Sequence, residues 1–190
     1  ANDLQTTKDL AAERAPLTPT VDINILGEAY IKWAGMDTVI TAGNQLIDTA
    51  FANPSDAFTI PITYTGYSLI NKSIPNLTIN AHQLLRIKNR EATDFTNVGR
   101  FITTRYKTTA TDTKGDTVVG LTYKWNNLTA QVWDYIHTDA LTMLFAQLDY
   151  GFDLGTYKPY VSAHFGSESE PGDAVLGAID STVVGLKVGV

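Results

Sequence analysis

The feature that most constrains this chain is an alternation of apolar and polar residues, which runs through most of the chain in separate segments from Val21 onward. A period of two is the spacing of side chains on one face of a β-strand. The alternating segments have the length of a membrane-spanning strand, which needs about 9–11 residues of which every second one is apolar. The sequence therefore predicts an all-β protein, with strands over residues 21–33, 38–45, 63–70, 77–88, 116–125, 128–137, 141–152, 157–165 and 181–190.

The breaks between these segments are alternately short and long. Residues 36–37, 71–76, 126–127 and 153–156 form short breaks, whereas 46–62, 89–115 and 166–180 form long ones. An up-and-down membrane barrel has this asymmetry, because its turns are short on one side of the membrane and its loops are long on the other. Only the break at 138–140 departs from it. We therefore predict an antiparallel up-and-down transmembrane β-barrel, with residues 1–20 and 89–115 as external loops.

Composition excludes several other classes of protein. The net charge of −6 argues against a nucleic-acid partner, because phosphate binding needs a concentrated basic surface. The chain has no cysteine, so it can form neither a disulfide framework nor a zinc–thiolate site. Its three histidines stand apart from other metal ligands, and no nucleophile motif is present. We expect no metal, no cofactor and no enzyme activity.

Each predicted strand has one apolar and one polar face. The sixth strand presents a conflict, because strict alternation from Leu128 places Asp134 on the apolar face. A β-bulge near Val132 would bring Asp134 to the polar face and turn Trp133 and Tyr135 to the apolar face, and we favour the bulge. The polar face is expected to carry six basic side chains, namely Lys32, Arg86, Lys88, Lys124, Lys158 and Lys187.

Alternation alone does not decide which face is inside. A soluble β-barrel or sandwich that binds a lipophilic ligand or a protein partner would bury the apolar face, whereas a membrane barrel turns it toward lipid. Four aromatic residues on the apolar face all lie next to short breaks: Trp33, Trp125, Phe152 and Tyr157. This common level is expected of an aromatic girdle at the membrane–water boundary. It favours the membrane barrel over the soluble one.

Several short motifs follow one another in order along the chain. They are Leu26-Gly27-Glu28-Ala29-Tyr30-Ile31-Lys32, Ala42-Gly43-Asn44-Gln45, Phe51-Ala52-Asn53-Pro54, Thr65-Gly66-Tyr67-Ser68-Leu69 and Asp134-Tyr135-Ile136. In this order they resemble the OprD-type family of outer-membrane specific porins, and among them the major porins of the epsilon group of proteobacteria. The similarity runs through most of residues 22–190.

The resemblance implies a larger, eighteen-stranded barrel in the bacterial outer membrane, a homotrimer at full length, of which this chain would be an internal fragment. It implies passive diffusion of small polar solutes or ions, with the six basic residues as a ladder on the lumen wall. It also implies that residues 46–62 fold into the lumen as a constriction loop. The apolar residues of that segment need a surface to pack on, and we expect Asp48, Asp56, Phe51 and Phe58 at the constriction.

Overall fold

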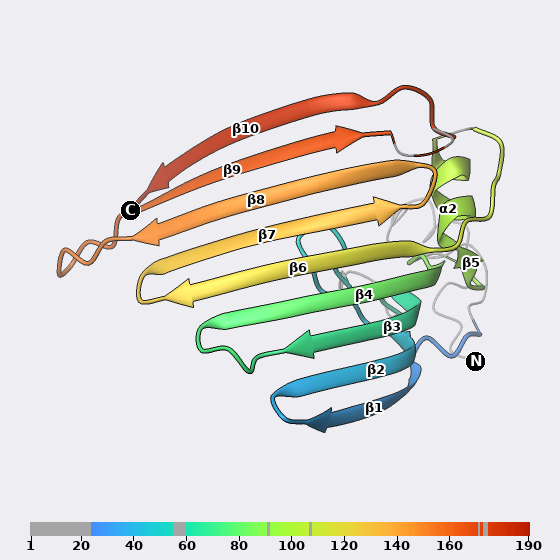
Figure 1. The fold of residues 1–190 in the computed structure, drawn as a ribbon, viewed down its shortest axis with the longest axis horizontal. Helices are drawn as coiled ribbons and strands as arrows, with labels where there is room; N and C mark the ends of the chain where they lie inside the picture. The colour runs from blue at the N-terminus through green and yellow to red at the C-terminus, as the bar shows by residue number, and fades with distance from the viewer. Residues whose placement is uncertain (1–23, 55–59, 91, 107, 171, 173–174) are drawn as a thin grey trace, which may run out of the picture.

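The computed structural model describes residues 24–54, 60–90, 92–106, 108–170, 172 and 175–190 of the chain. They form one curved antiparallel sheet whose strands follow one another in chain order (Figure 1). This order confirms the predicted up-and-down topology. The elements are β1 (Ala29–Gly35), β2 (Thr38–Gln45), β3 (Thr63–Asn71), β4 (Leu77–Lys88), β5 (Thr96–Asn97), α2 (Val98–Arg105), β6 (Asp116–Trp125), β7 (Leu128–His137), β8 (Leu141–Gly151), β9 (Tyr160–Ser169) and β10 (Asp180–Gly189).

The long connections all lie at one end of the sheet, together with the short β7–β8 turn, and the other short turns lie at the opposite end, as Figure 1 shows. Met36 and Asp37 have φ of 49° and 54°, the left-handed values of a two-residue hairpin turn whose twist matches the strands. The long connections are the loop 46–62, the segment 89–115 and the β9–β10 connection 170–179. No helix among the described residues is long and apolar enough to span a membrane.

Three predicted strand boundaries are wrong by three or more residues. The first strand begins at Ala29, because Ala29 pairs with Asn44 and β2 ends one residue later, so the described residues 24–28 lie outside the strand. The eighth predicted strand begins at Tyr160 instead of Tyr157 and ends at Ser169 instead of Phe165. Residues before it form a turn in which the Leu154 N–H donates to the Tyr157 carbonyl at 3.1 Å. Pro159 has no N–H to donate to a ladder, which explains the late start.

The predicted bulge near Val132 is absent, because β7 pairs in unbroken register with both β6 and β8. Trp133 and Tyr135 are buried on the polar face of the sheet, and Asp134 lies on the apolar face between Val119 and Leu144. The register shift occurs instead in β4, where Thr65 pairs with Arg86 while Gly66 pairs with Leu84. The extra residue reverses the alternation in the last part of β4.

The connection 89–115 holds structure that its polar sequence did not predict. Strand β5 pairs with β4, and α2 follows with Asn97 as its N-cap. The Asn97 side chain accepts hydrogen bonds from the N–H groups of Gly99 and Arg100, which would otherwise have no partner. Arg100 and Asp112 form an exposed ion pair at 2.7 Å, and this bond lowers the pKa of Asp112.

The apolar core lies on the polar face of the sheet, under the loop 46–62 and the segment 89–115. We call this face the inner face and the opposite one the outer face. Ile47 from the loop 46–62 and Val98 from α2 pack there against the strands. The remaining members of the cluster are Leu84, Ile87, Val118, Trp133 and Tyr135.

Candidate functional site

The described residues of the loop 46–62 lie on the inner face, and the first part of the loop is attached there through Tyr135. The Tyr135 hydroxyl donates to Thr49 Oγ1 at 2.9 Å and accepts from the Phe51 N–H at 3.0 Å. The Phe51 ring contacts the rings of Tyr135 and Phe145, with centroids 5.4 and 5.0 Å apart. The loop thus packs on the inner face, as its apolar residues predicted.

The returning part of the loop is held by Lys88. The Lys88 side chain is wholly buried, and its Nζ donates to the Ile60 carbonyl at 3.0 Å. The Ile62 N–H also donates to the Pro54 carbonyl at 3.0 Å, which closes the loop on itself. Both limbs of the loop therefore have polar anchors. Asp56 and Phe58 lie outside the described residues.

Asp48 is exposed on the loop and borders two hollows of the inner face. The first, of about 310 Å³, lies over β1–β4 and is also lined by Glu28, Lys32 and His82. The second, of about 510 Å³, extends over β3, β4, β6 and β7. Its other charged residues are Lys72 and Lys124. Among the described residues, the two hollows thus bring the loop carboxylate of Asp48 and the wall carboxylate of Glu28 together with three wall lysines.

The other four predicted basic residues line neither of these two hollows. Lys187 lies on the inner face of β10, with its Nζ 5.5 Å from the centre of the Tyr160 ring. Lys158 lies in the exposed turn before β9, where it pairs with Asp153 at 2.7 Å and lowers the pKa of that carboxyl. The prediction that Lys158 faces the lumen from a strand is therefore wrong.

Arg86 and Lys88 also depart from the predicted ladder, because of the register shift in β4. Ile87 is buried in the inner-face cluster, so Arg86 beside it points the other way and donates to the Phe95 carbonyl. Lys88 is buried under the loop as described above. Lys72, which was not predicted, lines the second hollow from the β3–β4 turn. Strand alternation could not indicate this residue, because it lies outside the strands.

The predicted girdle residues lie at the turn end of the sheet. Trp33 and Trp125 are about half exposed on β1 and β6, and Phe152 and Tyr157 lie in the β8–β9 connection. Tyr150 on β8 joins them, with its ring 4.8 Å from that of Phe152. Sequence reasoning did not include Tyr150 because the predicted strand ran past it to Phe152.

The outer face is apolar and exposed. A water-soluble monomer rarely exposes a continuous apolar patch of more than a few hundred Å². A soluble barrel would also place the loop on its apolar face, whereas here the loop packs on the polar one. The outer face consists of exposed side chains that include Ile31, Ile40, Val119, Leu121, Val132, Leu144, Leu148, Phe165, Val184, Leu186 and Val188.

The histidines do not assemble a metal site. His82 is buried with neither ring nitrogen bonded, and His164 lies on the inner face of β9. His137 Nδ1 lies 2.7 Å from Asp116 Oδ2 at the loop end of the sheet. Among the described residues, no three potential metal ligands come together.

Comparison with known protein families identifies one family. The family model described as "outer membrane porin, OprD family" matches residues 22–190. No curated protein matches the chain.

Three solved structures of outer-membrane porins have a fold similar to that of this chain. A BenF-like porin from Pseudomonas fluorescens superposes with a TM-score of 0.76 at 19% identity, over 92% of this chain and 46% of that one. The outer membrane protein OpdK from Pseudomonas aeruginosa gives 0.74 at 18% identity, over 85% and 43%. OccK2 from the same organism gives 0.71 at 19% identity, over 82% and 41%. The chain therefore spans less than half the length of these structures.

Proposed function

This chain belongs to the OprD family of outer membrane porins, and we propose that its inner face lines a water-filled pore through which small polar solutes and ions diffuse passively. As a porin of the bacterial outer membrane it is a channel protein and not an enzyme, and its outer face contacts membrane lipid. The observation that carries the proposal is the loop 46–62, which packs on a polar inner face and borders hollows with charges of both signs.

The loop would narrow the pore at the level of Asp48. A carboxylate on the loop and three lysines on the wall would set up a field across the opening. Low-dielectric protein walls focus such a field, and the field orients dipolar solutes as they pass. Because Lys32, Lys72 and Lys124 lie opposite one Asp48, anionic groups would lie along the wall and cationic groups along the loop.

Two relatives support small polar solutes as the transported class. OpdK has been solved with vanillate and OccK2 with glucuronate. Both compounds carry a carboxylate, and lysines of the inner face here offer the ammonium groups that bind one. The ladder of Lys32, Lys124 and Lys187, with Lys72 added, is our proposal for that path. The homotrimer at full length is part of the same proposal, and unheated full-length protein on a gel would migrate at three times its monomer mass.

Asp48→Asn in the full-length protein is expected to shift ion selectivity toward anions. The substitution removes the loop carboxylate from the two hollows and leaves the three lysines in place, so the ratio of chloride to potassium permeability should rise about twofold. The measurement is the reversal potential of purified channels in a planar bilayer under a KCl gradient.

Asp153→Asn is the matched control. Asp153 has the same carboxylate but lies in an exposed turn with Lys158, away from both hollows. Its reversal potential should equal that of the wild type. If Asp48→Asn channels conduct with unchanged selectivity, Asp48 does not lie at the constriction. If the purified protein never forms channels, the proposed function itself is wrong.

A further inference from the structure

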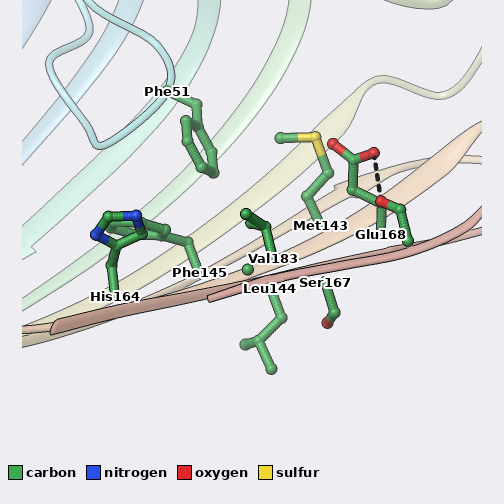
Figure 2. Close-up of a pocket in the computed structure, with 10 residues that line it drawn as sticks. Phe51, Met143, Leu144, Phe145, His164, Ser167, Glu168 and Val183 are labelled. Atoms are coloured by element: carbon green, nitrogen blue, oxygen red, sulfur yellow. Dashed lines mark hydrogen bonds between the residues drawn. The ribbon is translucent and has the colours of Figure 1, made fainter. Parts of the chain in front are cut away.

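The loop 46–62 separates inner-face surfaces of different chemistry. Asp48 borders the hollows with lysines, over the first part of the sheet. Phe51, three residues further along the loop, borders a third hollow of about 330 Å³ over β8, β9 and β10. Figure 2 shows Met143, Phe145, His164 and Val183 on the same side of the sheet as Phe51, while Leu144 and Ser167 point away. We call this third hollow the aromatic slot.

Phe51 forms one side of the aromatic slot and is held in place. The residue is 53% exposed although it carries a large apolar side chain on the inner face. Its N–H is bonded to the Tyr135 hydroxyl, and its ring meets Phe145 at an interplanar angle of 63°. The ring is therefore supported from below by edge contacts, and much of its surface stays free to contact a further ring.

Two glycines set the positions of side chains on the opposite side of the slot. A Cβ at Gly185 would come within 2.1 Å of His164 Nε2, so the imidazole lies across this glycine. A Cβ at Gly166 would lie 3.0 Å from a Val183 methyl group. Gly166 lines the slot without a side chain of its own, and Gly185 beside it leaves room for the His164 ring.

The charge of the slot differs from that of the lysine-lined hollows. Glu168 is the only carboxylate among the lining residues, and neither lysine nor arginine lines the slot. The Glu168 carboxylate accepts one hydrogen bond, from the Ser181 hydroxyl at 3.1 Å, and is otherwise exposed (Figure 2). A ligand for this slot therefore has an apolar flat part for the rings and a positive group for the carboxylate.

We propose that the aromatic slot is a binding subsite for permeating solutes that combine an aromatic ring with a protonated amine. The inference rests on the proposed porin function and adds a ligand class to one part of the pore. The solute ring packs beside Phe51 and Phe145, with the Met143 sulfur at its edge. Its ammonium group donates to Glu168 in a charge-assisted hydrogen bond.

The test measures how strongly amines block ion current through single channels of the full-length protein. The probes are benzylammonium, cyclohexylmethylammonium as a saturated amine of similar size, and benzoate as an aromatic anion. We expect benzylammonium to block at about three- to tenfold lower concentration than the saturated amine, the range that an aromatic pair contributes beyond its area. Benzoate should block at the same concentration in the wild type and in Glu168→Gln.

Two substitutions separate the two parts of the slot. Phe51→Leu should abolish the preference for the aromatic amine, and Phe51→Tyr, which keeps the ring, should retain it. Glu168→Gln should weaken block by both amines about equally. Glu28→Gln is the control, since Glu28 borders a different hollow and should leave the aromatic preference unchanged.

Some outcomes would overturn the inference and leave the porin intact. Channels that conduct KCl but show no difference between the two amines would do so. So would an aromatic preference that survives Phe51→Leu, or amine block that does not respond to Glu168→Gln. Absence of any conducting channel would overturn the proposed function as well, so the two failures are distinguishable.

Discussion

Replacing Leu121 or Leu148 by lysine in the full-length protein is expected to block membrane insertion almost completely. Both side chains are exposed on the outer face, and each is four residues from an aromatic of the turn end. A lysine that faces lipid near the middle of the membrane costs about 2–4 kcal/mol. The measurement is the folded fraction in liposomes, read from the difference in gel mobility between heated and unheated samples.

The neighbouring residues provide matched controls. Thr122 lines the second hollow, and Gln147 bonds to Gln131 and Asp149 on the inner face. Thr122→Lys and Gln147→Lys place the same charge one residue away, where water hydrates it. They should insert nearly as well as the wild type. Equal impairment in all four variants would show that the assignment of the two faces is incorrect.

Deleting residues 49–59 of the loop is expected to raise single-channel conductance about twofold, because the current through a pore follows its narrowest cross-section. The deletion removes Thr49 and Phe51, through which the loop is attached to Tyr135. The measurement is the conductance of purified full-length channels in planar bilayers. Unchanged conductance would mean that the loop packs on the wall without narrowing the pore.

A milder variant tests the same attachment. Tyr135→Phe removes the hydroxyl that bonds Thr49 and Phe51, and each such bond contributes about 0.5–1.5 kcal/mol. The loop should then fluctuate, and the open-channel current should become noisier. Tyr150→Phe, on the outer face, removes a hydroxyl elsewhere and should leave the current noise unchanged.

Most of the sheet was predictable because two independent signals agree along the chain. Residues 38–45, 77–88, 116–125 and 128–137 show period-two alternation and end at turns or loops that the sequence marks. Where only alternation was available, the prediction failed. Tyr157 and Lys158 alternate by chance before Pro159, and the described residues 24–28 alternate but lie outside β1.

The candidate site was predictable only in part. The apolar composition of the loop 46–62 predicted that it packs on the wall, and Lys32 and Lys124 lie on the inner face as expected. The position of Arg86 depends on a register shift between Thr65 and Gly66, and no residue pattern marks it. Asp134 follows simple alternation on the outer face, so the bulge proposed to avoid an outward charge was unnecessary.

Neither the position of Lys72 nor the aromatic slot could be predicted from the sequence, for a different reason. Both depend on which segments lie over which strands, and this follows from the three-dimensional path of the loop. Phe51 lies near Phe145 and His164, far along the chain, only because the loop crosses the sheet. Local periodicity carries no information on such contacts.

Single cysteines in β6 distinguish a pore-lining inner face from a lipid-facing outer face, since this chain contains no cysteine of its own. Channels of a cysteine-free full-length background with Thr122→Cys or Leu121→Cys would be recorded while a positively charged, membrane-impermeant thiol reagent is added. We expect stepwise loss of current with Thr122→Cys and no change with Leu121→Cys, because only the inner face lines a water-filled pore. Equal loss in both variants, or loss with Leu121→Cys alone, would show that the inner face does not line the pore.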